Sequence, residues 1–189
     1  MRMIEDAIVA CWVVFVAFWA VTALRTKRTV ERQGISDRLT HSLPIFAGAW
    51  LALKGTSDPG ALGNRVIPHS VPILLVGLAI TLAGLALALW ARVTLGANWS
   101  GIVTFKQDHE LIRHGPYGHV RHPIYSAILL MVLGSVLAIG TLGALVALPL
   151  IGVGIWLKLR QEEELMTAHF PGEYPSYRSQ VSALIPGVL

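Results

Sequence analysis

The chain has 189 residues, of which 54% are hydrophobic and only 14% are charged. Because a soluble domain carries about 25% charged residues, this composition excludes an ordinary soluble protein and indicates one compact membrane domain. The net charge of +4 does not indicate a nucleic-acid partner, since the basic residues stand at the ends of apolar runs, where orientation in a membrane explains them.

Apolar runs with helical spacing follow one another along the chain, and no stretch alternates like a strand. We expect about five transmembrane helices, at residues 8–24, 39–53, 71–91, 124–139 and 141–157. The second run is the weakest, because it is short and is interrupted by Pro44 and Gly48. Gly140 joins the last two runs into a helical hairpin with almost no loop. The predicted fold class is therefore an all-α integral membrane protein.

The C-terminal part of the chain changes character after the fifth run. Residues 158–165 are predicted to form a short polar helix, and residues 170–186 an amphipathic segment interrupted by prolines. No polar linker is long enough to separate two folding units, so we expect a single domain over residues 1–189.

The basic residues are distributed unevenly between the two sides of the predicted membrane domain. With five spans, twelve of the fifteen lysines and arginines fall on one side, and only Arg2, Lys54 and Arg65 fall on the other. Basic loops stay in the cytosol, so the basic loop after the first span, the third connection and the C-terminus are expected to be cytosolic.

The connection between the third and fourth spans holds an unusual cluster of polar residues. Residues 109–125 contain four of the seven histidines, two arginines and two tyrosines. Titratable side chains at a membrane boundary indicate a functional site. Gly115-Pro116 and Pro123 break a helix here, and irregular backbone at this depth is tolerated where it is buried in protein or lines a cavity. We expect an active site at the cytosolic face, formed by this loop and the C-terminal helix.

Metal binding and lipid binding are the simpler explanations of this cluster. The histidines are separated by four, four and two residues, which matches no structural zinc pattern, so no metal is expected. Lipid head groups would explain Arg113 and Arg121, but not the Gly-Pro-Tyr and Arg-His-Pro sequences beside them. Glu163, together with Lys158 and Arg160, could complete a polar pocket whose other wall is residues 109–125.

Two sequence motifs flank the helical hairpin. The first is Gly115-Pro-Tyr-Gly-His-Val-Arg-His-Pro-Ile-Tyr125, and the second comprises Glu162-Glu163, Phe170, Glu173-Tyr174, Tyr177, Val181 and Ile185-Pro186. In this order and spacing, the pair resembles the signature of the isoprenylcysteine carboxyl methyltransferases and of the related phospholipid N-methyltransferases. The resemblance covers about the last half of the chain.

The resemblance implies a methyltransferase that uses S-adenosylmethionine, with its catalytic half at about residues 92–189. By family position, the residues of the cofactor pocket would be His109, Glu110, Leu111, Ile112, Tyr117, His122, Pro123, Ile124, Tyr125 and Glu163. The family has an arginine where Lys158 stands, so either Lys158 or Arg160 would hold the acceptor, beside Glu163. The cofactor would arrive from the cytosol and a lipophilic acceptor from the bilayer.

The sequence leaves several alternatives open. The acceptor favoured by the resemblance is an isoprenylcysteine-like carboxylate, and the alternatives are a phospholipid amine or a small lipophilic thiol or amine. Membrane sterol reductases that use NADPH share a related C-terminal architecture, but this chain is short for them. A small transporter would carry charges within its spans, and the five apolar runs contain none. Membrane lipids are expected partners in each case, and the oligomeric state stays open.

Reporter fusions test the predicted topology. Fusions after Arg38, Lys106 and Leu189 should report the cytosol, and a fusion after Arg65 should report the opposite side, because the basic residues are split twelve to three. A cytosolic signal from the Arg65 fusion would rule out five spans.

Overall fold

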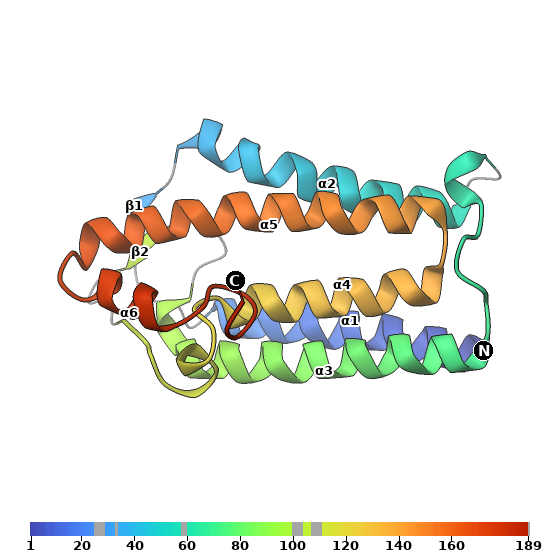
Figure 1. The fold of residues 1–189 in the computed structure, drawn as a ribbon, viewed down its shortest axis with the longest axis horizontal. Helices are drawn as coiled ribbons and strands as arrows, with labels where there is room; N and C mark the ends of the chain where they lie inside the picture. The colour runs from blue at the N-terminus through green and yellow to red at the C-terminus, as the bar shows by residue number, and fades with distance from the viewer. Residues whose placement is uncertain (25–28, 33, 58–59, 100–103, 107–110, 189) are drawn as a thin grey trace.

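The computed structural model describes residues 1–24, 29–32, 34–57, 60–99, 104–106 and 111–188, and within them five long helices run alternately up and down an elongated bundle (Figure 1). The helices are α1 (Arg2–Ala23), α2 (Ile35–Ser57), α3 (Val71–Leu95), α4 (Pro123–Ile139) and α5 (Leu142–His169). A short helix, α6 (Tyr174–Gln180), lies at the end of the bundle where α5 finishes. The predicted all-α class is confirmed.

The apolar character of the helices is that of an integral membrane protein. Arg2–Ala23, Val71–Asn98 and Leu142–His169 are long and apolar enough to cross a membrane, and Pro123–Ile139 is a shorter apolar helix. The helix α2 falls outside this set although it is 23 residues long, which agrees with the weakness expected of the second run. Large apolar side chains such as Phe46 and Trp50 are exposed along it, as they are on a lipid-facing surface.

Four of the five long helices extend several residues beyond the apolar runs that predict them: α1 and α2 at residues 2–7, 35–38 and 54–57, and α3 and α5 at their C-terminal ends. The helix α5 continues through residues 158–165, which were expected to form a separate polar helix. No glycine or proline stands between Ile155 and Phe170, and the charged residues there are good helix formers, so nothing ends the helix. The helix α3 continues beyond Ala91 and includes Arg92, which is buried.

The structure contains a pair of short strands that were not predicted from the sequence. The strands β1 (Thr29–Arg32) and β2 (Thr104–Lys106) pair antiparallel and connect the segment after α1 to the segment after α3. Three or four residues are too few to show the two-residue alternation by which a strand is recognised, so the sequence does not indicate them.

Glycines allow the helices to pack in two close pairs. In the α3–α4 pair, a Cβ added at Gly77 or Gly84 would meet backbone carbonyl oxygens of α4. In the α2–α5 pair, a Cβ at Gly154 would lie 2.7 Å from the His41 carbonyl oxygen, and one at Gly48 would lie 2.9 Å from the Ala147 carbonyl oxygen. Small residues of this kind let backbones approach closely in lipid, where apolar burial does not drive association.

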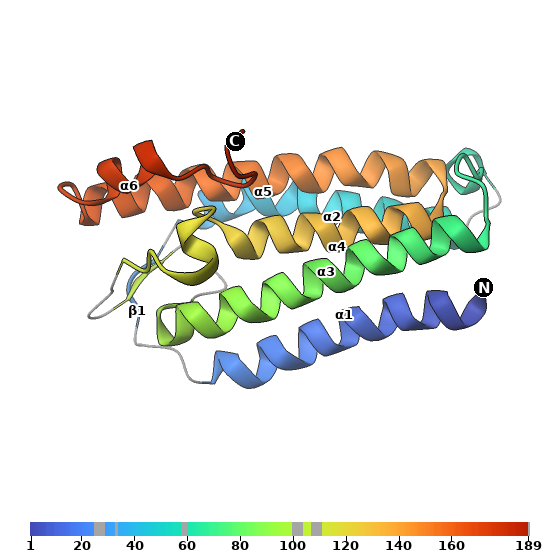
Figure 2. The same ribbon diagram turned by 60° about the horizontal axis from the view of Figure 1, so that its bottom comes forward.

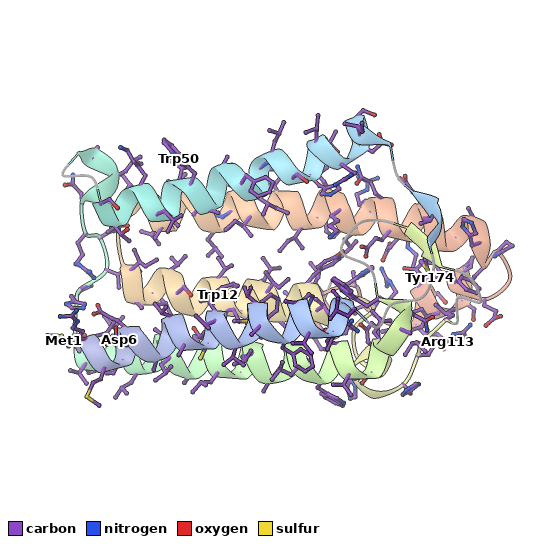
Figure 3. All side chains as sticks on the ribbon, turned by 180° about the vertical axis from the view of Figure 1, so that it is seen from behind. Met1, Asp6, Trp12, Trp50, Arg113 and Tyr174 are labelled. Atoms are coloured by element: carbon purple, nitrogen blue, oxygen red, sulfur yellow. The ribbon has the colours of Figure 1, made fainter. Side chains whose placement is uncertain are left out.

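The two ends of the bundle differ in composition. Met1 and Asp6 lie at one end, while Arg113 and Tyr174 lie at the other (Figure 3), which is the end that holds α6. The helix α1 packs beside α3 and α2 packs beside α5, so these pairs form opposite edges of the bundle (Figure 2). The ion pairs Arg113–Glu173, Arg121–Glu163 and Arg178–Glu163 all lie at the end that holds α6.

Replacing Gly134 with alanine tests the close approach of α3 and α4. The new methyl group would meet the Gly77 carbonyl oxygen and the Thr81 hydroxyl, so the variant should lose about 1–3 kcal/mol of stability through overpacking. Thermal unfolding in detergent measures the loss. Gly152→Ala in α5 is the matched control, because nothing lies within 4 Å of its added Cβ. Equal melting temperatures for the two variants would contradict this packing.

Candidate functional site

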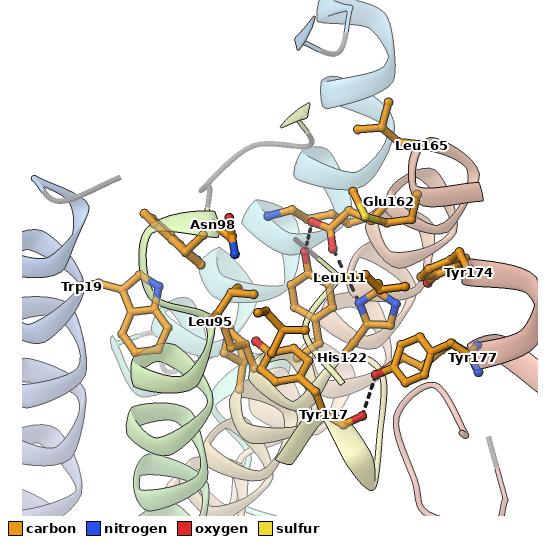
Figure 4. A pocket seen from close by; sticks show the side chains of 18 of the residues that line it. Trp19, Leu95, Asn98, Leu111, Tyr117, His122, Glu162, Leu165, Tyr174 and Tyr177 are labelled. Atoms are coloured by element: carbon orange, nitrogen blue, oxygen red, sulfur yellow. Dashed lines mark hydrogen bonds and ion pairs between the residues drawn. The ribbon is translucent and has the colours of Figure 1, made fainter. Parts of the chain in front are cut away.

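A cavity of about 410 Å³ lies at the polar end of the bundle. Its lining comes from α1, the end of α3, the segment 111–125, α4, α5 and α6 (Figure 4). The volume falls within the range of small-molecule sites, which are concave, mostly apolar and furnished with a few placed polar groups. Elements from both ends of the sequence therefore build one site.

One wall of the cavity is aromatic and apolar. Phe15 and Trp19 come from α1, and their rings stack with centroids 4.0 Å apart. Trp99, just after α3, meets Trp19 edge to face at 6.4 Å. Leu95 and Ile128 also belong to the lining. This wall offers contact area to an apolar ligand and no charge.

The opposite wall is polar and charged. Arg121 and His122 reach the cavity from the connection before α4, and Lys158 and Glu162 reach it from α5. The Tyr125 hydroxyl donates a hydrogen bond to the Glu162 carboxylate (Figure 4). The Lys158 ammonium lies 5.5 Å from the centroid of the Tyr125 ring, within reach of a cation–π interaction.

The local sequence explains the shape of the connection before α4. Residues Gly115–Gly118 form a single 3₁₀ turn, in which Gly115 has a φ of 61°, a conformation that favours glycine. Pro123 opens α4 at its first turn, where its missing N–H is not needed. His122, the residue before the proline, is therefore held outside the helix with its ring toward the cavity.

The C-terminal residues lie along this connection and hold it in place. The backbone N–H groups of Arg121 and His122 donate to the carbonyl oxygens of Ser182 and Ala183 at 2.8 and 3.0 Å. The Ser126 hydroxyl donates to the Leu184 carbonyl oxygen at 2.6 Å. We call residues 181–184 the C-terminal strap. It fixes a loop that has little regular structure of its own.

Glu163 is the buried centre of an ion-pair network. One of its carboxylate oxygens accepts hydrogen bonds from Arg121 Nη2 at 2.6 Å and Arg121 Nε at 2.8 Å. His122 Nε2 lies 3.3 Å from the same oxygen, and Arg178 Nε lies 3.4 Å from the other. Arg121 also donates to the Val181 carbonyl oxygen in the strap. The Glu163 and Arg121 side chains are only 6% and 8% exposed, so this pair joins α5, the loop and the strap out of water.

His122 stands between two carboxylates. Its Nδ1 lies 3.6 Å from Glu162 and its Nε2 lies 3.3 Å from Glu163. Burial opposes a charge on this ring, but hydrogen bonding to Glu162 and Glu163 outweighs burial and raises the pKa of His122. A protonated imidazole donates from both nitrogens, which matches the two acceptors.

Tyr177 holds α6 against the segment before α4. The Tyr177 hydroxyl donates to the Tyr117 carbonyl oxygen at 2.6 Å (Figure 4). Burial raises the pKa of Tyr177 to about 12, so the donor keeps its proton. Arg113 forms an ion pair with Glu173 at 2.5 Å at the exposed edge of this contact. The short helix α6 is thereby fixed as one side of the cavity.

Two buried polar atoms on the lining lack a hydrogen-bond partner within the described part of the chain. They are the side-chain carbonyl oxygen of Asn98 and the hydroxyl of Tyr174. The Tyr174 hydroxyl lies beside the Arg121 guanidinium but outside hydrogen-bond geometry. Buried polar groups are nearly always paired, so unpaired ones on a cavity wall indicate where a ligand would bind.

The structure brings most of the residues expected from the sequence to this cavity. Seven line it: Leu111, Ile112, Tyr117, His122, Ile124, Tyr125 and Lys158. Pro123 is buried at the start of α4 and does not line it, and Arg160 points to the exterior. Glu163 lies behind the wall, in the ion-pair network. His109 and Glu110 lie outside the described residues. The roles assigned to these residues stay predictions.

Several lining residues were not selected from the sequence. Glu163 was predicted to line the cofactor pocket, but Glu162 lines the cavity in its place. Successive residues on a helix point about 100° apart, so only one of the two glutamates can face the cavity. Tyr174 and Tyr177 belong to the second motif, and their spacing of three on a helix was the available signal. Phe15 and Trp19 lie outside residues 92–189, and no motif marks them.

The sequence of this chain is similar to those of known proteins. Residues 75–168 match the model of the isoprenylcysteine carboxyl methyltransferase family. The chain is 31% identical over 102 residues to a protein-S-isoprenylcysteine O-methyltransferase of Schizosaccharomyces pombe, over 51% of this chain and 42% of that protein. It is 30% identical over 114 residues to a probable protein-S-isoprenylcysteine O-methyltransferase of Oryza sativa subsp. indica, over 59% of this chain and 60% of that protein. The matched region thus spans about half the length of these relatives.

Replacing Glu163 with alanine tests the buried network. The change leaves the Arg121 guanidinium buried without its carboxylate, which typically costs about 3–5 kcal/mol. The melting temperature in detergent should fall, and limited proteolysis should cut within the released strap. Glu164→Ala, one position along α5 and exposed, is the matched control and should behave as the wild type. A Glu163→Ala variant as stable and as protease-resistant as this control would contradict the network.

Proposed function

The chain belongs to the isoprenylcysteine carboxyl methyltransferase family, and on that premise we propose that it transfers a methyl group from S-adenosylmethionine to a lipophilic acceptor at the cytosolic face of the membrane. The acceptor most in keeping with the names of its relatives is the carboxylate of an isoprenylcysteine. The active site is the cavity between α1, α4, α5 and α6.

The observation that carries this proposal is the contrast between the two walls of one cavity. A water-soluble cation and a lipophilic acceptor must meet in a single place for this reaction. The polar wall of Arg121, His122 and Glu162 faces an aromatic wall of Phe15 and Trp19, which belongs to a lipid-exposed helix. A site at the end of a membrane bundle is open to both kinds of ligand.

The chemistry of the lining fits S-adenosylmethionine. The Glu162 carboxylate offers a negative charge to a cationic ligand, and the faces of Tyr117 and Tyr125 offer cation–π contact. The unpaired oxygens of Asn98 and Tyr174 offer partners for amino and hydroxyl groups. When bound, the cofactor would supply a methyl group bonded to a positively charged sulfur. An in-line nucleophile takes such a methyl group while its bond to sulfur breaks and the neutral thioether leaves.

The protein's own residues have mainly a positioning role in such a reaction. An ionised carboxylate attacks a methyl group without needing a general base, so no proton must be removed from the acceptor. Lys158 carries the charge suited to holding that carboxylate at the cavity. Orienting two reactants can lower a barrier by about 7–11 kcal/mol, and the buried α6 tyrosines help to exclude water.

A binding and transfer experiment tests the proposal. Purified protein in detergent should bind S-adenosylmethionine by calorimetry and should not bind NADPH, which separates this enzyme class from a reductase. Radiolabelled methyl transfer is then compared for S-farnesylcysteine, phosphatidylethanolamine and a lipophilic thiol. Transfer to S-farnesylcysteine supports the carboxyl methyltransferase, and transfer only to the amine or the thiol identifies an N- or S-methyltransferase. Binding of NADPH without binding of S-adenosylmethionine would overturn the proposal.

Two substitutions on α5 should fail in different ways. Glu162→Gln removes a charge from the cofactor side and should raise the Kd for S-adenosylmethionine about tenfold or more, since a charge-assisted contact is worth about 1.5–3 kcal/mol. Lys158→Met should instead raise the KM for the acceptor. The Arg160 side chain points away from the cavity, so Arg160→Met should leave both constants unchanged.

The acceptor KM and the cofactor Kd are measured for each variant, and together they show which ligand each residue serves. Glu164→Gln is the matched control for Glu162→Gln, because it removes the same charge from an exposed position of the same helix. If Arg160→Met raises the acceptor KM and Lys158→Met does not, the acceptor role belongs to Arg160.

A further inference from the structure

Arg92 is a buried arginine that the proposed reaction does not use. Its residue exposure is 2%, and it does not line the cavity. A charged side chain near a membrane is costly to bury, so its partners should explain why it is there. It lies in the last turn of α3, within a helix apolar enough to span a membrane.

The guanidinium of Arg92 connects the ends of two helices. Nη1 donates to the Gly96 carbonyl oxygen at 2.6 Å, at the end of α3. Nη2 donates to the Thr22 carbonyl oxygen at 2.8 Å, in the last turn of α1. The carbonyl groups at the end of a helix carry partial negative charge, so a cation that binds their oxygens there is favourable. A lysine could not reach both carbonyls in this forked geometry.

The same guanidinium also lies over Trp99. Its central carbon is 4.6 Å from the centroid of the indole ring. Trp99 meets Trp19 edge to face, and Trp19 stacks on Phe15. Figure 4 shows Trp19 at the α1 side of the cavity, opposite the α6 tyrosines. Arg92 therefore contacts both the helix that carries two members of the aromatic wall and the ring of the third.

We propose that Arg92 is a positioning residue for the acceptor side of the site: it fixes α1 against α3 and Trp99 against Trp19, and so sets the shape of the wall that receives the apolar part of the acceptor. The inference rests on the proposed function. It assigns the aromatic wall of Phe15, Trp19 and Trp99 to the apolar part of the acceptor. Lys158 is left for the acceptor's carboxylate, and the rest of the polar wall for the cofactor. Arg92 itself touches neither ligand.

The test separates the two ligands. Arg92→Met removes the forked contacts and the cation while keeping an unbranched apolar side chain. The acceptor KM for S-farnesylcysteine should rise about tenfold or more, and the Kd for S-adenosylmethionine should stay within about twofold of wild type. Arg38→Met is the matched control, because Arg38 is exposed near the start of α2. A merely structural role would change both constants together, or neither.

Two further variants keep the test decisive if Arg92→Met does not fold. Arg92→Lys keeps the charge over Trp99 but reaches one carbonyl at most, and its acceptor KM should rise by less. Trp99→Leu removes the wall member and should raise the acceptor KM with Arg92 in place. The double variant Arg92→Met/Trp99→Leu should be no worse than the more severe single variant, because both act through the same wall.

The outcomes separate a failure of the role of Arg92 from a failure of the proposed function. If the wild type transfers methyl groups but Arg92→Lys and Trp99→Leu leave the acceptor KM unchanged, the role of Arg92 is overturned and the proposed function stands. A cofactor Kd that rises as much as the acceptor KM also overturns it. If the wild type neither binds S-adenosylmethionine nor transfers methyl groups, the proposed function fails and the inference falls with it.

Discussion

The buried ion pair between Arg121 and Glu163 is the interaction on which the rest of the site depends. It joins the irregular connection before α4 to the end of α5, and through the Val181 carbonyl oxygen to the C-terminal strap. Removing two charges from water is costly, and such a pair persists only when the remaining hydrogen-bonding capacity is also satisfied. Here Arg178 and His122 complete the coordination of the carboxylate.

The consequence of this pair is that a membrane protein can present an irregular loop in a fixed shape. The segment from Gly115 to His122 contains only one short 3₁₀ turn, so its position comes from the strap and from α6. The close glycine contacts in the α3–α4 and α2–α5 pairs supply the rigid frame behind it. The consecutive helices α4 and α5 contact one another much less than either contacts its partner, and the cavity is lined by the start of α4 and the C-terminal part of α5.

Much of this structure could be predicted from the sequence, for identifiable physical reasons. The long apolar runs predict the helices, and Gly140, with a φ of 67°, forms the tight hairpin as expected. The motif around His122 marks the site because polar residues at a membrane boundary require a reason. Pairing between distant segments could not be predicted in the same way. Nothing in the spacing of Glu162 and Glu163 says which carboxylate meets Arg121, because that depends on the rotation of α5 about its axis.

The contribution of α1 was equally hidden from the sequence. Phe15 and Trp19 read as ordinary lipid-facing aromatics of a first span, and only the packing of α1 beside α3 brings them to the cavity. A search confined to residues 92–189 therefore misses Phe15 and Trp19, two members of the aromatic wall. The same packing explains why Arg92, at the end of an apolar run, is buried and not a loop residue at the surface.

Photo-crosslinking tests the central claim, that S-adenosylmethionine binds in the cavity between α1, α4, α5 and α6. A derivative of the cofactor with an azide on its adenine ring is irradiated with the purified protein, and the labelled peptides are identified by mass spectrometry. Labelling should fall on peptides that contain Asn98 or residues 111–125 and 158–177, and excess S-adenosylhomocysteine should abolish it. Labelling elsewhere in the chain, or labelling that the competitor leaves unchanged, would contradict the account.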